Sequence, residues 1–171
     1  MFDCHAHLTD PKLQVDLDLL LVEAENVGVA GIVAVSESVE DCSKVLELCE
    51  KINADPYRSI RIYPSFGMHP ERADIEGVDE ILRLIDLHAD QLVCVGEVGL
   101  DYSRHLIGEG EEAELAKMVQ REVLERQARK AEDLGLALNV HSRSAGHHAI
   151  SLLRDIGLSR AVFHAFDGKP K

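Results

Sequence analysis

The chain has 171 residues and a formal net charge of −13 at pH 7, with 46% hydrophobic and 29% charged residues. This length and composition are typical of a soluble, globular protein, and we expect a single domain over residues 1–171. The acidic charge argues against binding nucleic acid through a basic surface, because such binders usually place Lys and Arg opposite the phosphates.

Apolar runs alternate along the chain with amphipathic segments. The first apolar run, at residues 2–5, starts almost at Met1. In chain order, the pattern predicts a strand at 2–5, a helix at 15–27, a strand at 30–35, a helix that begins after Ser38, a strand at 59–66, a helix at 78–87, a strand at 92–98, a helix at 111–134, a strand at 136–141, a helix at 148–156 and a strand at 160–165.

Strands that alternate with helices indicate βαβ units and a parallel sheet. Two architectures compete for this pattern, an open doubly wound sheet and a TIM-type (β/α)₈ barrel. A doubly wound nucleotide binder should carry a glycine-rich turn after an early strand, and the glycines at 96, 99 and 108 do not form one. We therefore predict a TIM-barrel-like α/β fold with about six of the eight βα units that a barrel requires.

Potential metal ligands stand at the ends of four predicted strands. His5 and His7 project from the same face of the first strand, and Glu97, His141 and His164 end three later strands. A single His at a strand end is more often a structural residue of the rim. Four such ends together favour a metal centre at the carboxyl rim of a barrel, where functional residues gather.

This ligand set predicts two divalent metal ions, Mg²⁺, Mn²⁺ or Zn²⁺. Glu97 is the natural bridge, because a carboxylate offers one oxygen to each ion. We expect His5 and His7 to hold one ion, and His141 and His164 to hold the other.

The remaining histidines and the cysteines have structural interpretations. His88, His105, His147 and His148 are expected at the surface, and Cys42 and Cys49, one heptad apart on a predicted helix, are expected in the core. Basic residues between 121 and 130 lie among glutamates on one helix, which is typical of a solvated face.

Several segments resemble the motifs of the TatD-type metal-dependent hydrolases, in particular the TatD-domain deoxyribonucleases of animals. The resemblance covers nearly the whole chain. It rests on DCHAHL at 3–8, GMHP at 67–70, GEVGLD at 96–101, the helix with QR at 120–121 and QA at 127–128, NVHSR at 139–143 and HAFDG at 164–168.

The resemblance implies a TIM-barrel hydrolase that cleaves DNA phosphodiester bonds with a metal-activated water. Members are described as metal-dependent nucleases, often 3′-to-5′ exonucleases, so DNA is the expected substrate. The implied ligands are again His5, His7, Glu97, His141 and His164, with Glu97 at the catalytic centre.

His69 and Arg143 would lie in the site and contact substrate without holding metal. For Arg143 the alternatives are a clamp on a phosphate oxygen and a salt bridge with a carboxylate of the rim. For His69 they are a contact to the scissile phosphate and a hydrogen bond to a loop carbonyl. Asp101 is expected to shape the loop after the fourth strand rather than to ligate metal.

One family motif has no counterpart in this sequence. It is an aspartate at the end of the eighth strand that binds metal and helps to handle the proton of the attacking water. Asp167 does not match it, because it follows the sixth strand. The sequence therefore predicts a shortened barrel with exposed edges at its first and sixth strands.

Three functions remain open: a DNA phosphodiesterase, a hydrolase of a small ester, lactone or amide, and a catalytically inert form that binds metal. No obligate protein partner is evident. No apolar run reaches the roughly 20 residues of a membrane span, and no basic start precedes an apolar core. We therefore expect no membrane association, and a cytoplasmic or nuclear location.

Overall fold

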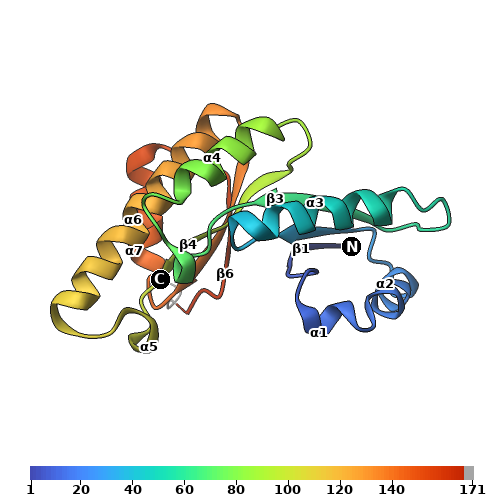
Figure 1. Cartoon of the computed structure of the whole chain (residues 1–171), viewed down its shortest axis with the longest axis horizontal. Helices are drawn as coiled ribbons and strands as arrows, with labels where there is room; N and C mark the ends of the chain where they lie inside the picture. The colour runs from blue at the N-terminus through green and yellow to red at the C-terminus, as the bar shows by residue number, and fades with distance from the viewer. Residues whose placement is uncertain (168–171) are drawn as a thin grey trace.

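The computed structural model describes residues 1–167, so Gly168 of the last motif lies outside the described part. Six strands form one sheet (Figure 1), and every neighbouring pair is parallel. The strands are β1 (Phe2–Ala6), β2 (Gly31–Val35), β3 (Arg61–Phe66), β4 (Cys94–Asp101), β5 (Ala137–Arg143) and β6 (Ala161–His164).

The strand order decides between the two predicted architectures. Neighbours in the sheet follow the chain order from β1 to β6, with no reversal. A doubly wound sheet reverses its order at a switch point, whereas a barrel adds each strand beside the last one. The predicted barrel-like fold is therefore confirmed.

Helices cover the outside of this sheet (Figure 1). They are α1 (Pro11–Gln14), α2 (Leu17–Asn26), α3 (Val39–Asn53), the short 3₁₀ helix η1 (Pro70–Arg72), α4 (Val78–Leu87), α5 (Arg104–Ile107), α6 (Gly110–Asp133) and α7 (Gly146–Ile156). The longer ones turn an apolar stripe toward the strands. Cys42 and Cys49 lie on that stripe of α3, at 1% and 2% exposure, so the core positions predicted for them are confirmed.

The sheet curls until its first and last strands face each other. The rings of His5 on β1 and His164 on β6 lie with their centroids 3.7 Å apart. Asn139 on β5 also reaches across the interior and donates a hydrogen bond to the Cys4 carbonyl of β1, at 2.6 Å. Side chains from strands at opposite ends of the sheet thus meet in one place.

Two strands extend further than the sequence pattern predicted. β4 continues to Asp101 and β5 to Arg143, because their backbone ladder continues through the pairs Gly99–His141 and Asp101–Arg143. Gly99 permits this close approach, since its φ is +149° and a Cβ there would lie 2.0 Å from the His141 carbonyl oxygen. The extension brings Asp101 and Arg143 to the same rim as Glu97 and His141.

In place of the predicted helix at 15–27, the structure has two helices, and the first of them begins before residue 15. Asp10 accepts a hydrogen bond from the Lys12 amide, and Pro11 occupies the first helical position of α1. Both features favour a helix start. The backbone breaks before Leu17, where α2 begins. The short helix α5 was also not predicted.

Two histidines expected at the surface are partly buried. His88 packs edge-on against Phe66, with ring centroids 5.7 Å apart, and the ring of His148 lies 5.3 Å from that of Tyr102. His105 and His147 are exposed, as expected.

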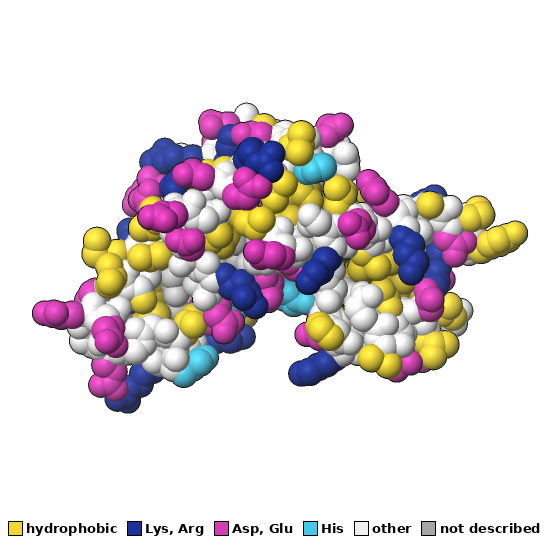
Figure 2. All heavy atoms as spheres, in the orientation of Figure 1, with side chains coloured by type: hydrophobic (Ala, Val, Ile, Leu, Met, Phe, Trp, Pro, Cys, Tyr) yellow, Lys and Arg dark blue, Asp and Glu magenta, His cyan; other side chains and the backbone are white. Residues whose placement is uncertain are grey.

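Charged side chains are scattered over the outer surface among apolar and uncharged ones. Figure 2 shows acidic side chains spread over the helices, with Lys and Arg between them, and a hollow below the sheet in which a histidine is visible. Among residues 1–167, no helix is both long enough and apolar enough to cross a membrane.

Candidate metal centre

Glu97 lies at the centre of the curled sheet. Its backbone amide donates to the carbonyl of Ser36, the residue after β2, at 3.0 Å, and the Ser65 hydroxyl donates to the Gly96 carbonyl at 2.8 Å. The residue is only 1% exposed. A buried carboxylate is unfavourable unless positive groups surround it, so the neighbours of Glu97 decide what this position does.

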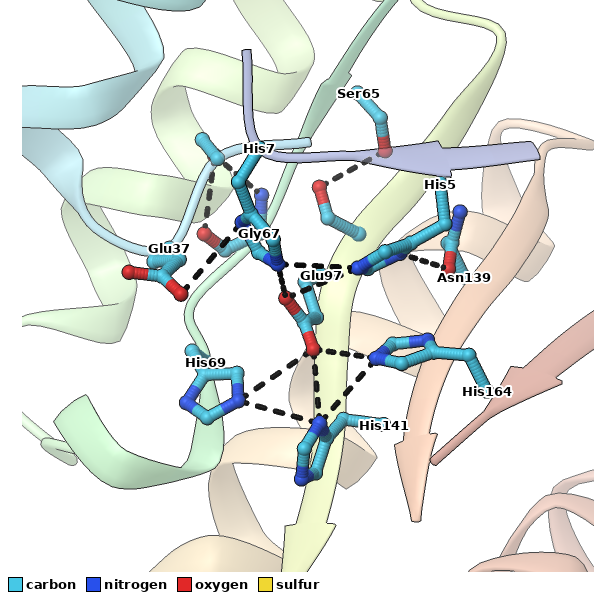
Figure 3. Close-up of polar contacts among 12 residues, drawn as sticks. His5, His7, Glu37, Ser65, Gly67, His69, Glu97, Asn139, His141 and His164 are labelled. Atoms are coloured by element: carbon cyan, nitrogen blue, oxygen red, sulfur yellow. Dashed lines mark hydrogen bonds and ion pairs between the residues drawn. The ribbon is translucent and has the colours of Figure 1, made fainter. Parts of the chain in front are cut away.

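One carboxylate oxygen of Glu97 faces the first strand (Figure 3). His7 Nε2 lies 3.1 Å from Oε2 and His5 Nε2 lies 3.6 Å from it. The two imidazole nitrogens are themselves only 3.1 Å apart. Three potential ligand atoms therefore converge on one point.

The other oxygen faces strands β5 and β6 and the segment after β3 (Figure 3). Oε1 lies 2.6 Å from His164 Nε2, 2.9 Å from His141 Nδ1 and 3.4 Å from His69 Nε2. The structure thus brings all five predicted ligands together, with His5 and His7 at one oxygen of Glu97 and with His141, His164 and also His69 at the other.

The chemistry of these atoms fits divalent cations. Glu97 Oε2 is buried and receives no hydrogen bond within the described residues, although two ring nitrogens surround it. Burial alone would raise the pKa of Glu97, but its contacts with His141, His164 and His7 outweigh burial and hold the pKa well below its ordinary value. The carboxylate therefore stays ionised, and a divalent cation could replace the ring protons that these histidines direct at it.

Asn139 determines which nitrogen of His5 faces Glu97. The amide of Asn139 donates to the Cys4 carbonyl, so its Oδ1 is the atom that lies 2.9 Å from His5 Nδ1. We therefore assign the ring proton to Nδ1, which leaves Nε2 with a free lone pair. Burial lowers the pKa of His5, which also favours the neutral ring.

His69 has the opposite assignment. Its Nδ1 accepts the Glu71 amide at 3.1 Å at the start of η1, so the proton of a neutral ring sits on Nε2 and points at Glu97. Burial lowers the pKa of His69 to about 4, so the ring is neutral near pH 7. The contact to a loop carbonyl considered from the sequence is replaced by one to a loop amide.

Arg143 occupies the edge of the site. Its Nη1 lies 3.5 Å from Asp101 Oδ2, and its side chain is 52% exposed. The rim salt bridge considered from the sequence is thus present, and the exposed guanidinium also lines the same cavity of about 270 Å³ as Glu97 and the histidines.

The chain matches the family model described as "TatD related DNase" over residues 2–171. The chain belongs to this TatD family. The resemblance inferred from the motifs is therefore confirmed.

Two relatives illustrate the range of the TatD family. The chain is 39% identical over 173 residues to the human protein named deoxyribonuclease TATDN3, covering 99% of this chain and 62% of that one. It is 29% identical to the 3′-5′ ssDNA/RNA exonuclease TatD of Musicola paradisiaca, covering 98% and 60%. This chain thus spans about three-fifths of the length of these relatives.

Solved TatD structures share the fold. A TatD family hydrolase from Entamoeba histolytica superimposes with a TM-score of 0.81 at 25% identity, covering 98% of this chain and 58% of that one. A TatD homologue from Escherichia coli K12 gives 0.81 at 24% identity, covering 99% and 61%.

Three residues of the site have contacts that the sequence did not predict: Asp101 is a partner of His141, Asn139 is a partner of His5, and Glu37 is a partner of His7. Glu37 Oε1 lies 3.6 Å from His7 Nδ1. The strand period of two could have predicted the first two positions. Asp101 is four residues after Glu97 and Asn139 is two before His141, so each lies on the same strand face as its predicted ligand. Glu37 follows the end of β2, where only the barrel geometry places it beside His7.

Proposed function

We propose that this chain is a metal-dependent hydrolase whose site holds two divalent cations, Mg²⁺, Mn²⁺ or Zn²⁺. His5, His7 and Glu97 would hold one ion, and Glu97, His141 and His164 the other. The observation that supports this most is that the two oxygens of Glu97 face two separate pairs of histidine nitrogens. This division matches a carboxylate bridge between two ions.

Divalent ions at such a site polarise the scissile group and lower the pKa of water to near neutrality. The chain's own residues supply orientation and charge. His69 presents a neutral Nε2–H donor to an oxygen of the substrate. Arg143, on the exposed edge, provides a planar guanidinium that can pair with a phosphate oxygen. Glu97 stays ionised and fixes the spacing of the two halves.

DNA is the substrate that we propose. The human relative is named a deoxyribonuclease and the Musicola relative a 3′-5′ ssDNA/RNA exonuclease. In this chain, Arg143 at the edge of the cavity suits a phosphodiester. We propose cleavage of DNA phosphodiester bonds, with removal of nucleotides from a 3′ end as the mode to test first.

The test is degradation of a DNA oligonucleotide by this 171-residue chain. Two substrates, labelled at the 5′ or the 3′ end, are incubated with Mg²⁺ or Mn²⁺, with EDTA, and with the Glu97→Gln variant. We expect cleavage that needs metal, is lost with Glu97→Gln, and shortens the 5′-labelled strand stepwise. Cleavage that persists in EDTA or in Glu97→Gln would refute the proposed centre.

A small ester, lactone or amide is the second candidate substrate. The net charge of −13 favours it, because a polyanionic strand is repelled by an acidic surface. The same preparation is therefore assayed with small esters and lactones. Turnover of these without DNA cleavage supports this candidate. A folded, metal-loaded chain that acts on neither class supports the inert form instead.

A further inference from the structure

Asp101 ends β4 on the same face as Glu97 and contacts His141 from the side away from Glu97. Its Oδ2 lies 3.2 Å from His141 Nε2, and both residues are buried, at 3% and 4% exposure. The ring of His141 is thus held between two carboxylates, with Nδ1 2.9 Å from Glu97 and Nε2 toward Asp101.

The remaining contacts of Asp101 fix its orientation. Oδ1 accepts the Ser103 amide at 2.8 Å, which leaves Oδ2 directed at His141 and, at 3.5 Å, at Arg143. The Asp101 amide is in turn bound by the buried Gln120 at 2.9 Å. The following loop therefore holds the Asp101 carboxylate, and α6 holds the Asp101 backbone.

We propose that Asp101 is a positioning residue that sets the tautomer of His141. It accepts the Nε2 proton, which leaves the Nδ1 lone pair directed into the half of the site formed by Glu97 and His164. A carboxylate behind a metal-binding imidazole fixes the ring and raises its basicity. This inference rests on the proposed metal centre and adds a residue that touches neither Glu97 nor the cation position.

His164 provides an internal contrast. Its Nδ1 is buried and has no partner within the described residues. Two histidines of the same half thus differ, since one ring is held by a carboxylate and the other is not. Loss of Asp101 should therefore weaken this half through His141 alone.

Asp101→Asn is the variant to test, because the amide oxygen can still accept the Ser103 amide while the charge is removed. The first measurement uses metal-free protein, in which long-range ¹H–¹⁵N NMR spectra report the His141 tautomer. Because Nδ1 can also donate to Glu97 at 2.9 Å, we expect the wild type to populate both tautomers, and we expect Asp101→Asn to lose the Nε2–H form. An unchanged tautomer in a folded variant would overturn the proposal.

The second measurement is Mn²⁺ binding, followed by calorimetry and by paramagnetic broadening of the histidine signals to identify each half. We expect Asp101→Asn to weaken binding beside His141 by about 10–100-fold, the usual effect of removing such a partner, and to leave binding beside His5 unchanged. Glu37→Gln is the matched control, because it also neutralises an acid of the cavity but lies beside His7. It should leave binding beside His141 unchanged.

The outcomes separate this inference from the proposed function. If the wild type binds no Mn²⁺, the proposed centre fails while the NMR result still decides the role of Asp101. If Glu37→Gln weakens both halves as Asp101→Asn does, general charge explains the effect and positioning is refuted. If Asp101→Asn abolishes one ion altogether, Asp101 is a ligand and the proposal is wrong.

Discussion

Glu97 is buried and negatively charged, so replacing one of its carboxylate oxygens should strongly affect metal binding at the site. Replacing Oε1 or Oε2 with an amide nitrogen would place N–H groups against ring nitrogens at 2.6–3.6 Å. Metal binding to the folded state alone stabilises it by mass action, about 2.7 kcal/mol at a concentration 100 times Kd. Mn²⁺ should therefore raise the Tm of the wild type.

We expect Glu97→Gln to abolish this rise in Tm, because the two halves of the site share this carboxylate and would both lose its negative charge. Calorimetric scans with and without Mn²⁺ measure it. His105→Gln serves as the control, because His105 lines the same cavity but is exposed, and no hydrogen bond or ion pair within residues 1–167 joins it to Glu97. An undiminished rise in Glu97→Gln would contradict the shared bridge.

His69 predicts a pH dependence of stability in the metal-free protein. Its pKa falls from 6.5 to about 4 because burial disfavours the charged ring. The unfolded chain therefore binds the proton first, and stability is lost as the pH falls from 6.5 toward 4, by roughly 3 kcal/mol at most. Above pH 6.5 the ring is neutral in both states and contributes no slope.

Urea unfolding between pH 4 and pH 7 tests this prediction. His69→Asn should show a shallower loss of stability than the wild type, because Asn does not titrate and its side-chain oxygen can still accept the Glu71 amide. Identical slopes in the two proteins would show that the His69 ring is not held neutral by the fold.

The elements show how far the sequence alone could lead. The spacing of apolar residues, together with the glycines that end the predicted helices, located all six strands. The ends of four of these strands identified the residues that the structure places around Glu97. Their roles as ligands stay predictions. The sequence could not locate the last residues of β4 and β5, because these join the sheet through Gly99, whose close approach depends on the partner strand. Asp101 was therefore predicted to shape the loop after this strand; it does accept the Ser103 amide of that loop, but it is itself the last residue of β4.

Gly99 also gives a prediction at the scale of the element. Gly99→Ala should cost at least about 1–3 kcal/mol, because φ is +149° and the new Cβ would meet the His141 carbonyl oxygen. It should also displace His141 and weaken Mn²⁺ binding. Urea unfolding and calorimetric titration measure the two effects.

Gly28→Ala is the matched control for Gly99→Ala. Gly28 follows α2 with φ of +84°, and a Cβ there would meet nothing within 4 Å. We expect a loss of about 1 kcal/mol from the backbone conformation alone and unchanged metal binding. If Gly99→Ala behaved in the same way as Gly28→Ala, the close contact between β4 and β5 would not position the site.

The whole molecule carries a charge of −13, which limits how it can hold a nucleic acid. Within residues 1–167, Arg143 is the single Arg or Lys that lines the cavity at Glu97. An adjoining hollow contains Lys44 and Arg72, but four acidic residues line it as well. These two hollows therefore offer few cations to replace the counterions of a DNA strand, so under the proposed function the affinity would come largely from bound metal ions.

This charge distribution predicts a weak dependence of DNA binding on salt. For a single strand, the logarithm of affinity falls with the logarithm of salt by about 0.7 per phosphate neutralised. With Arg143 as the main contact, we expect a slope of about −1 or shallower. Binding of an uncleavable phosphorothioate strand at fixed Ca²⁺ and varied KCl measures it, and Arg143→Gln should flatten the slope further. A slope several times steeper would mean that a basic surface outside this cavity holds the strand, and the cavity at Glu97 would then not account for substrate binding.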